Sequence, residues 1–342
     1  MATTFKTLNS ANDVTSTRTL LHEAIPLTGT IASGTYADAN IKTYSHGMFE
    51  SVYDYPYLSS SANHIFDITT GYASNSPLSG AASVQNSKKL NIYSQMAQVL
   101  VGYDATGSIQ NFDEDGDIAA GGDKIKEAIF VNFSRLLTKD EMKKGSFTMS
   151  VVTGGAPGAV SDVMTIKDHG AGTAYKVNSP AGEYGILYSG SAATTGEEVG
   201  LVYYQAGVVV LTGSVFAASQ MGPGIITGSG FNVIATGSTI NVMANSFRNR
   251  LQNISFNNTV ELNSTVYFCR ASHNEFNYSN NPTYLSQSQI RVKNSTTDNP
   301  VSYVTTVGLY SADNELLAVA KLSEPLKKDP STEVTLRVRL DF

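Results

Sequence analysis

The sequence predicts a mainly β protein, built of antiparallel sheets or a sandwich, with a small α+β part at its N-terminus. Short β-branched runs alternate with Gly-rich turns from Ser146 onward. The C-terminal segment alternates apolar and polar residues, the period expected of a strand with one buried face. Helical spacing of apolar residues is confined to residues 84–144, where two or three helices are predicted.

The predicted helices belong to an N-terminal α+β domain, residues 1–145. One helix, ending near Gly102, is predicted from apolar residues at helical spacing: Leu90, Tyr93, Met96, Ala97 and Leu100. A second helix, with Asp123 as its N-cap, is predicted from another apolar stripe: Ile125, Ile129, Phe133, Leu136 and Leu137. Residues 138–141 match a capping box and predict one more helical turn before Gly145.

Two β domains are predicted to follow, a Gly/Ser-rich domain over residues 146–240 and an antiparallel domain over residues 241–342. Residues 201–211 predict a hairpin, whereas residues 225–238 are rich enough in Gly and Ser for a long loop or arm. Residues 301–342 predict a three-stranded meander. The apolar face of its last strand would consist of Val334, Leu336, Val338, Leu340 and Phe342.

The aromatic run near residue 50 would place Tyr53, Tyr55 and Tyr57 on one face of an extended segment. Tyrosine is enriched at protein interfaces, so this face is either a contact surface or part of the domain's own core. The sequence alone favours neither reading.

The low charge content favours a protein that packs against other proteins. Charged residues are 15% of the chain, against roughly 25% in ordinary soluble domains. A neutral polar surface costs less to desolvate than a charged one. The alternative is an ordinary β-sandwich protein with a neutral surface.

Charge and hydropathy also exclude some partners. The net charge of -6 argues against nucleic-acid binding, which needs clustered Lys and Arg. No apolar run approaches the ~20 residues that span a bilayer, and the first ten residues lack the apolar segment of a signal peptide. A soluble protein, made in the cytoplasm and without a membrane partner, is expected.

One motif suggests a metal site. Asp113, Asp115 and Asp117 alternate around Gly116, and such carboxylates can wrap a hard cation such as Ca²⁺. An EF-hand loop has its invariant Gly at position six and Glu at position twelve; here Gly is at position four and Lys124 at position twelve. The sequence therefore favours a solvated acidic turn, with these three aspartates as a calcium candidate.

No catalytic constellation and no cofactor site is predicted, so the expected function is not enzymatic. The five histidines lack the spacing of metal-binding pairs. Cys269 and His273 are too close along one segment to act together as nucleophile and base. The sequence marks no pair of carboxylates for glycoside cleavage, although a depolymerase-type enzyme would need one.

Several segments carry a resemblance to a known family. The segments EFNYSNNPT (275–283), YVTTVGLY (303–310) and LLAVAKL (316–322) resemble virion structural proteins of tailed phages, with T4-like myoviruses of cyanobacteria as the closest group. The segments YSHGMF (44–49) and HIFDI (64–68) look like the N-terminal region of the same family. No functional residue carries over, because the match is one of pattern.

The resemblance implies a non-enzymatic structural subunit of a contractile tail, most similar in plan to a baseplate wedge protein. Its partners would be other tail and baseplate proteins and further copies of itself, as a homo-oligomer within the virion. It would be synthesised and assembled in the host cytoplasm and reside in the virion tail. The alternatives are a tail-fibre, adhesin or fibre-attachment module that binds host surface glycans, and a neck or head decoration protein.

Overall fold

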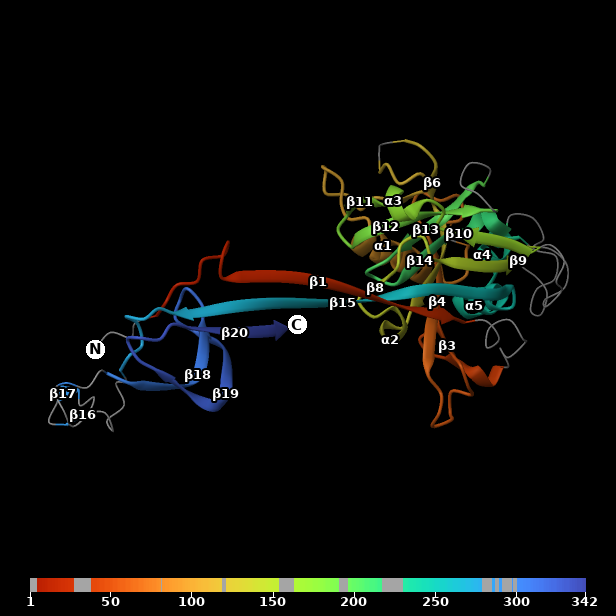
Figure 1. The fold of residues 1–342 in the computed structure, drawn as a ribbon. Coiled ribbons are helices and arrows are strands. Elements are labelled where there is room, and N and C mark those ends of the chain that lie inside the picture. Colours follow the sequence, from red (N-terminus) through yellow and green to blue (C-terminus); the bar gives the residue numbers. More distant parts are fainter. Residues whose placement is uncertain are drawn as a thin grey trace. The chain divides into compact units, whose positions relative to one another are not determined.

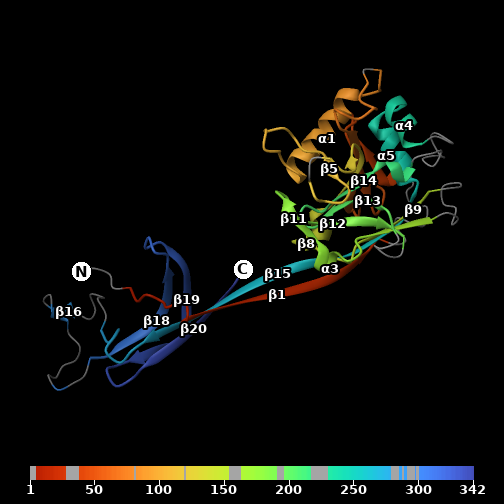
Figure 2. The ribbon, with the colours of Figure 1, turned by 90° about the horizontal axis from the view of Figure 1, so that it is seen from above.

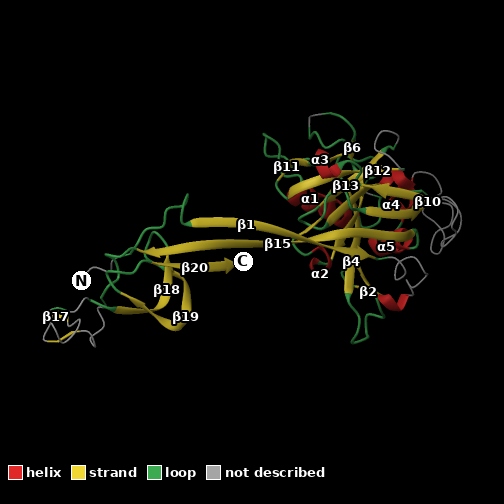
Figure 3. Ribbon diagram, in the orientation of Figure 1, coloured by secondary structure: helices red, strands yellow, loops and turns green. Residues whose placement is uncertain are grey.

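The computed structural model confirms the mainly β prediction (Figure 1). Among the described residues, strands make up 47% and helices 16%, and the large sheet is antiparallel (Figure 3). The structure describes residues 5–27, 38–80, 82–118, 121–153, 163–190, 196–216, 230–278, 285–286, 289–290, 297 and 300–342.

The chain forms two compact units. We call Leu21–Val260 the core unit, and Met1–Leu20 together with Glu261–Phe342 the terminal unit. Two long strands, β1 (Val14–Pro26) and β15 (Leu251–Ala271), have residues in both. This division differs from the three consecutive domains predicted, because strands from residues 148–212 hydrogen-bond within one sheet to strands on either side of them in sequence.

The core unit is built on one antiparallel sheet. Its strands follow the order β15-β9-β10-β12-β13-β14-β7-β4-β3-β2, with β11 beside β12 and β8 beside β15. Their bounds are β2 (Ile41–Thr43), β3 (Glu50–Tyr53), β4 (His64–Tyr72), β7 (Glu127–Phe133), β8 (Glu141–Met142), β9 (Thr148–Val152), β10 (Val163–Lys167), β11 (Lys176–Ser179), β12 (Gly182–Ser189), β13 (Glu198–Tyr203) and β14 (Val208–Thr212). The predicted hairpin of residues 201–211 is confirmed as β13–β14.

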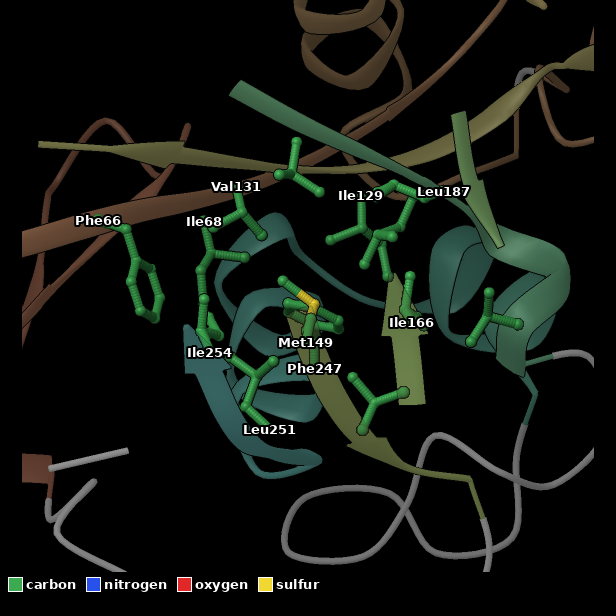
Figure 4. Close-up of a cluster of buried hydrophobic side chains, with 14 of the residues drawn as sticks. Phe66, Ile68, Ile129, Val131, Met149, Ile166, Leu187, Phe247, Leu251 and Ile254 are labelled. Atoms are coloured by element: carbon green, nitrogen blue, oxygen red, sulfur yellow. The ribbon is translucent and has the colours of Figure 1, made fainter. Parts of the chain in front are cut away.

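The sheet curls back on itself around the larger of two hydrophobic clusters. Phe133 of β7 and Phe256 of β15 are far apart in strand order, yet their ring centroids are 5.2 Å apart. Figure 4 shows Met149 and Phe247 at the centre of this cluster, between Ile68 of β4 and Ile166 of β10. Two helices close it, α4 (Phe231–Gly237) and α5 (Ile240–Arg248).

The second cluster lies on the other face of the sheet and includes residues of helix α1 (Asn86–Leu100). Figure 2 shows α1 beside α4. Helix α1 was predicted, and its buried residues include Tyr93, Ala97 and Leu100. Its Lys89 is fully buried, and the ammonium group donates to three backbone carbonyls, those of Val84, Ala235 and Ser238, at 2.6–2.8 Å. These bonds tie α1 to the C-terminal end of α4, because the last carbonyls of a helix lack partners within it.

The predicted second helix is wrong. The stripe from Ile125 to Leu137 forms β6 (Lys124–Ile125), which pairs with β5 (Phe112–Asp113), then β7 and the short helix α2 (Arg135–Thr138). Strand β7 lies between the two clusters, with Phe130 in one and Val131 in the other. A strand buried on both faces shows no alternation, so its apolar residues matched a helical spacing by coincidence.

Two smaller predictions in the core unit are also corrected. Glu141 of the supposed capping box begins β8 instead of a helical turn. Residues 231–237 of the supposed arm form α4, while residues 217–229 lie outside the described part. The remaining short helices are η1 (Asp38–Asn40), α3 (Ala171–Ala174) and η2 (Gly213–Phe216).

The terminal unit contains strand β20 (Val334–Asp341), paired with β15 from Ser264↔Asp341 to Ala271↔Val334. Strands β18 (Ser302–Tyr310) and β19 (Leu316–Lys328) form a separate hairpin, and β16 (Leu285–Ser286) pairs with β17 (Gln289–Ile290). The predicted meander is therefore corrected: among the described strands β20 pairs with β15 and not with β19. Alternation identifies a strand but not its neighbour.

Candidate functional site: an exposed apolar face and an acidic loop

The terminal unit has almost no hydrophobic core of its own. Neither hydrophobic cluster contains a residue from it, and among its described residues only the hydrophobic side chains of Val266 and Val338 are buried. Among its described residues, twelve large hydrophobic side chains are exposed: Phe5, Leu20, Leu262, Phe276, Tyr278, Tyr303, Tyr310, Leu316, Leu317, Val319, Leu326 and Phe342. We call this set the terminal apolar surface.

The β18–β19 hairpin and the C-terminus carry the most exposed members of this surface. Leu317 is 68% exposed and Val319, two residues along the same strand, is 52% exposed. Phe342 is 75% exposed, so the prediction that it completes a buried face is wrong. The alternation along β20 is real, because Val338 is buried and its neighbours Arg337 and Arg339 are exposed. No described side chain covers the end of that face.

Strand pairing and a few side-chain contacts, and not a hydrophobic core, hold the described parts of the terminal unit together. The fully buried ammonium group of Lys328 donates to Asn277 Oδ1 at 2.7 Å and to the carbonyl of His273 at 3.3 Å. The rings of Phe5 and Tyr310 meet at 4.8 Å. Apolar faces left open in this way are typical of a protein–protein interface.

Charge differs between the two units. The terminal unit has ten Lys and Arg and ten Asp and Glu, so the net charge of -6 comes entirely from the core unit. Self-repulsion opposes association of proteins with a large net charge. A neutral, apolar terminal unit is free of that repulsion.

The second candidate is the acidic loop that follows β5 in the core unit. Asp113, Asp115 and Asp117 each place one carboxylate oxygen within 4.8 Å of the other two. Asp113 is buried, at 2% exposure, whereas Asp115 and Asp117 are exposed. The structure therefore brings together the three aspartates that the sequence singled out.

The electrostatics of this loop reflect crowded carboxylates. Burial, with the neighbouring carboxylate of Asp115, raises the pKa of Asp113, although the Lys124 ammonium pairs with its Oδ2 and works in the opposite direction. Burial and the carboxylates of Asp115 and Asp113 also raise the pKa of Glu198 on β13. Sequence inspection could not associate Glu198 with the loop, because it is more than eighty positions away.

Other residues weighed from the sequence do not come together. Burial and the carboxylate of Asp13 raise the pKa of Cys269, the opposite of what an activated thiolate needs. His22 bonds to Thr259 and His169 to the carbonyl of Gly190, and no histidine belongs to a metal-binding group in the described part of the chain. The tyrosine face is kept only in part: the strand ends at Tyr53, Tyr55 and Tyr57 are exposed in the loop after it, and the ring centroids of Tyr53 and Tyr57 are 6.4 Å apart.

One polar trio was not anticipated. The Ser51 hydroxyl donates to Asp67 Oδ1 at 2.5 Å, and His64 Nε2 lies 2.8 Å from the same oxygen. In a catalytic triad the imidazole stands between the serine and the carboxylate. Here the carboxylate stands in the middle, so the serine lacks the bond to histidine that would activate it.

None of the described helices is both long and apolar enough to cross a membrane. Comparisons with protein-family models, with curated proteins and with solved structures find no match to this chain.

Proposed function

We propose that this chain is a structural subunit of a phage virion, located at the baseplate of a contractile tail, and that it assembles through the terminal apolar surface. The observation that carries the proposal is the contrast between the two units. The core unit buries two hydrophobic clusters, whereas the terminal unit exposes the apolar residues of its strands.

Stability considerations support a partner for the terminal unit. Burial of apolar area is the main favourable term in folding, at roughly 25 cal/mol per Å². A unit with two buried hydrophobic side chains among its described residues gains little from this term. Association with another apolar surface would supply the missing burial, as it does in obligate assemblies.

The neutral charge supports further copies of this chain among the partners. Ten basic and ten acidic residues leave no net repulsion between two terminal units. The segments that resemble phage virion proteins also cover most of β18 and the first half of β19, the strands of the exposed hairpin. Other tail proteins are the remaining partners in this proposal.

Purified particles from the source test the placement in a virion. We expect mass spectrometry of such particles to detect this chain at a copy number comparable to those of other structural proteins. Particles that are infectious and lack the chain would remove the virion proposal.

The self-association step is tested with a charged variant of the hairpin. We expect Leu317→Lys combined with Val319→Lys to weaken self-association by about tenfold or more, because each lysine removes apolar area from the interface and adds a charge. Sedimentation equilibrium measures the dissociation constant of self-association. Leu136→Lys, at the 83% exposed position of α2 in the core unit, is the matched control and should leave association unchanged. A monomeric wild-type chain at high concentration would contradict self-association.

A further inference from the structure

We propose that the acidic loop of the core unit binds a divalent cation of the Ca²⁺ class through Asp113, Asp115 and Asp117. This site is independent of the assembly function proposed above. Three features of the loop support such a site: the spacing of the carboxylate oxygens, a buried oxygen without a hydrogen-bond partner, and the anchoring of the loop.

The spacing of the three carboxylates fits a single ion. Ca²⁺ takes oxygen ligands at 2.3–2.6 Å, so two oxygens on one ion are at most about 5 Å apart. One oxygen from each of the three aspartates lies within 4.8 Å of the others. The exposed positions of Asp115 and Asp117 leave room for water molecules to complete the six to eight ligands that Ca²⁺ takes.

A buried carboxylate oxygen points independently to a ligand. Asp113 is 2% exposed, and its Oδ2 pairs with the Lys124 ammonium. Its Oδ1 is buried and has no hydrogen-bond partner among the described residues. Buried polar atoms in native proteins nearly always have partners, because an unsatisfied group forfeits its hydration. A bound cation would satisfy this oxygen.

The loop is anchored to the sheet. The Tyr184 hydroxyl of β12 lies 3.0 Å from the Gly116 carbonyl, and the Asn178 side-chain amide donates to the same carbonyl at 3.1 Å. The Asp117 N–H donates to Asp115 Oδ1 at 3.0 Å, which closes the turn that carries these two carboxylates. Ligands held by a rigid scaffold need less ordering when the ion binds.

The arrangement favours Ca²⁺ at moderate affinity. Mg²⁺ demands a near-ideal octahedron and sheds its water reluctantly, whereas Ca²⁺ tolerates irregular sites of three carboxylates and water. The Lys124 ammonium repels a cation, and this position supplies the bidentate Glu in an EF-hand. We therefore expect a dissociation constant of roughly 10⁻⁵–10⁻³ M, the range of weak sensor and extracellular sites.

Terbium luminescence tests the site on the full chain. Tb³⁺ replaces Ca²⁺ in oxygen sites and is excited through nearby tyrosine; the chain has no Trp, and Tyr184 adjoins the loop. We expect Tb³⁺ emission that millimolar Ca²⁺ displaces, and at least tenfold weaker Tb³⁺ binding in Asp115→Asn combined with Asp117→Asn. Asp313→Asn, at an exposed acidic position of the terminal unit, is the control and should bind as the wild type does. Equal binding by the double variant and the wild type would overturn the site, as would the absence of Ca²⁺ displacement.

A second variant tests the geometry around Asp113. Lys124→Met removes the positive charge beside the proposed ligand, so we expect Ca²⁺ binding to tighten by about tenfold in isothermal titration calorimetry. Circular dichroism would confirm that the variant folds. Unchanged or weaker Ca²⁺ binding by a folded Lys124→Met variant would overturn the placement of the ion at Asp113.

Discussion

Replacing Gly71 with alanine is expected to lower the free energy of unfolding of the core unit by about 3 kcal/mol or more. A Cβ atom at this position of β4 would lie 2.6 Å from the carbonyl oxygen of Lys89 and 2.9 Å from the backbone nitrogen of Tyr93. Both atoms belong to the backbone of α1, so a rotamer change cannot relieve the clash. The helix would have to move away from the sheet.

Movement of α1 would also disturb the buried Lys89. Its ammonium group donates to carbonyls in the turn before α1 and at the end of α4, and a shift of the helix would stretch these bonds. Hydrogen bonds to charged groups contribute about 1.5–3 kcal/mol each. The loss of stability in Gly71→Ala therefore comes from the clash itself and also from weakened hydrogen bonds between α1 and α4.

Thermal denaturation measures the effect. A loss of 3 kcal/mol corresponds to a fall in Tm of about 6–12 °C for a unit of this size. Gly80→Ala is the matched control, because a Cβ there has no heavy atom within 4 Å, and we expect a change of at most about 0.5 kcal/mol. If Gly71→Ala and Gly80→Ala have the same Tm, the close approach of α1 to β4 is wrong.

The sequence correctly predicted parts of the fold that carry a clear local signal, whether one face is buried, as in α1, or both faces, as in β13 and β14. Helix α1 and the β13–β14 hairpin have local signals, a helical stripe in the first case and a turn between β-branched runs in the second. The prediction for strand β7 failed because both faces of this strand are buried, which removes the alternation that distinguishes a strand from a helix. The prediction of the strand that pairs with β20 failed because strand pairing is decided by tertiary contacts that no local pattern encodes.

The acidic loop was only partly predictable for the same reason. Alternate aspartates around Gly116 showed three carboxylates that could converge, and the structure brings them together. The burial of Asp113 and the proximity of Glu198 depend on β5 and β13 packing in the folded core unit. Gly116 does not match the EF-hand pattern, whereas Ile118, at position six, adopts the left-handed conformation with a φ of 57°.

The exposure of the terminal apolar surface also lay beyond sequence reasoning. Periodicity predicts which residues share a face of a strand, and the face of β20 around Val338 follows that prediction. Periodicity does not show whether the surface that covers such a face belongs to the same chain or to another. Phe342 illustrates the limit, because its alternation with Asp341 predicted burial and the side chain is 75% exposed.

Substitution of Asp168 is expected to have the second large effect on the stability of the core unit. Its side chain is 2% exposed, and Oδ2 accepts hydrogen bonds from the Tyr204 hydroxyl at 3.0 Å and from the Gly145 N–H at 2.7 Å. Asp168→Ala would leave both donors without an acceptor, and an unsatisfied buried group costs about 1–3 kcal/mol. We expect this variant to lose about 2–5 kcal/mol of stability in urea denaturation at neutral pH.

The same carboxyl makes stability depend on pH. Burial raises the pKa of Asp168 to about 6 from its ordinary 3.8, although the bonds from Tyr204 and Gly145 lower it in part. Between pH 4 and 6 the folded protein keeps a proton that the unfolded chain has released, so stability from this group falls as pH rises through that window. The total loss is about 3 kcal/mol, at 1.36 kcal/mol for each pKa unit.

Asp168→Asn isolates this contribution, because the amide oxygen can still accept from Tyr204 and Gly145 while the group cannot ionise. Lys144 lies over the Tyr204 ring and pairs with Glu141 and Glu183, and these charged groups are the same in both proteins, so their effects cancel in the difference between the two pH profiles. We expect the stability of Asp168→Asn relative to wild type to rise by about 2–3 kcal/mol from pH 4 to pH 6.5 and then to stay level. Parallel profiles for the two proteins would show that Asp168 keeps an ordinary pKa in the folded state, and its burial beside Tyr204 would then need revision.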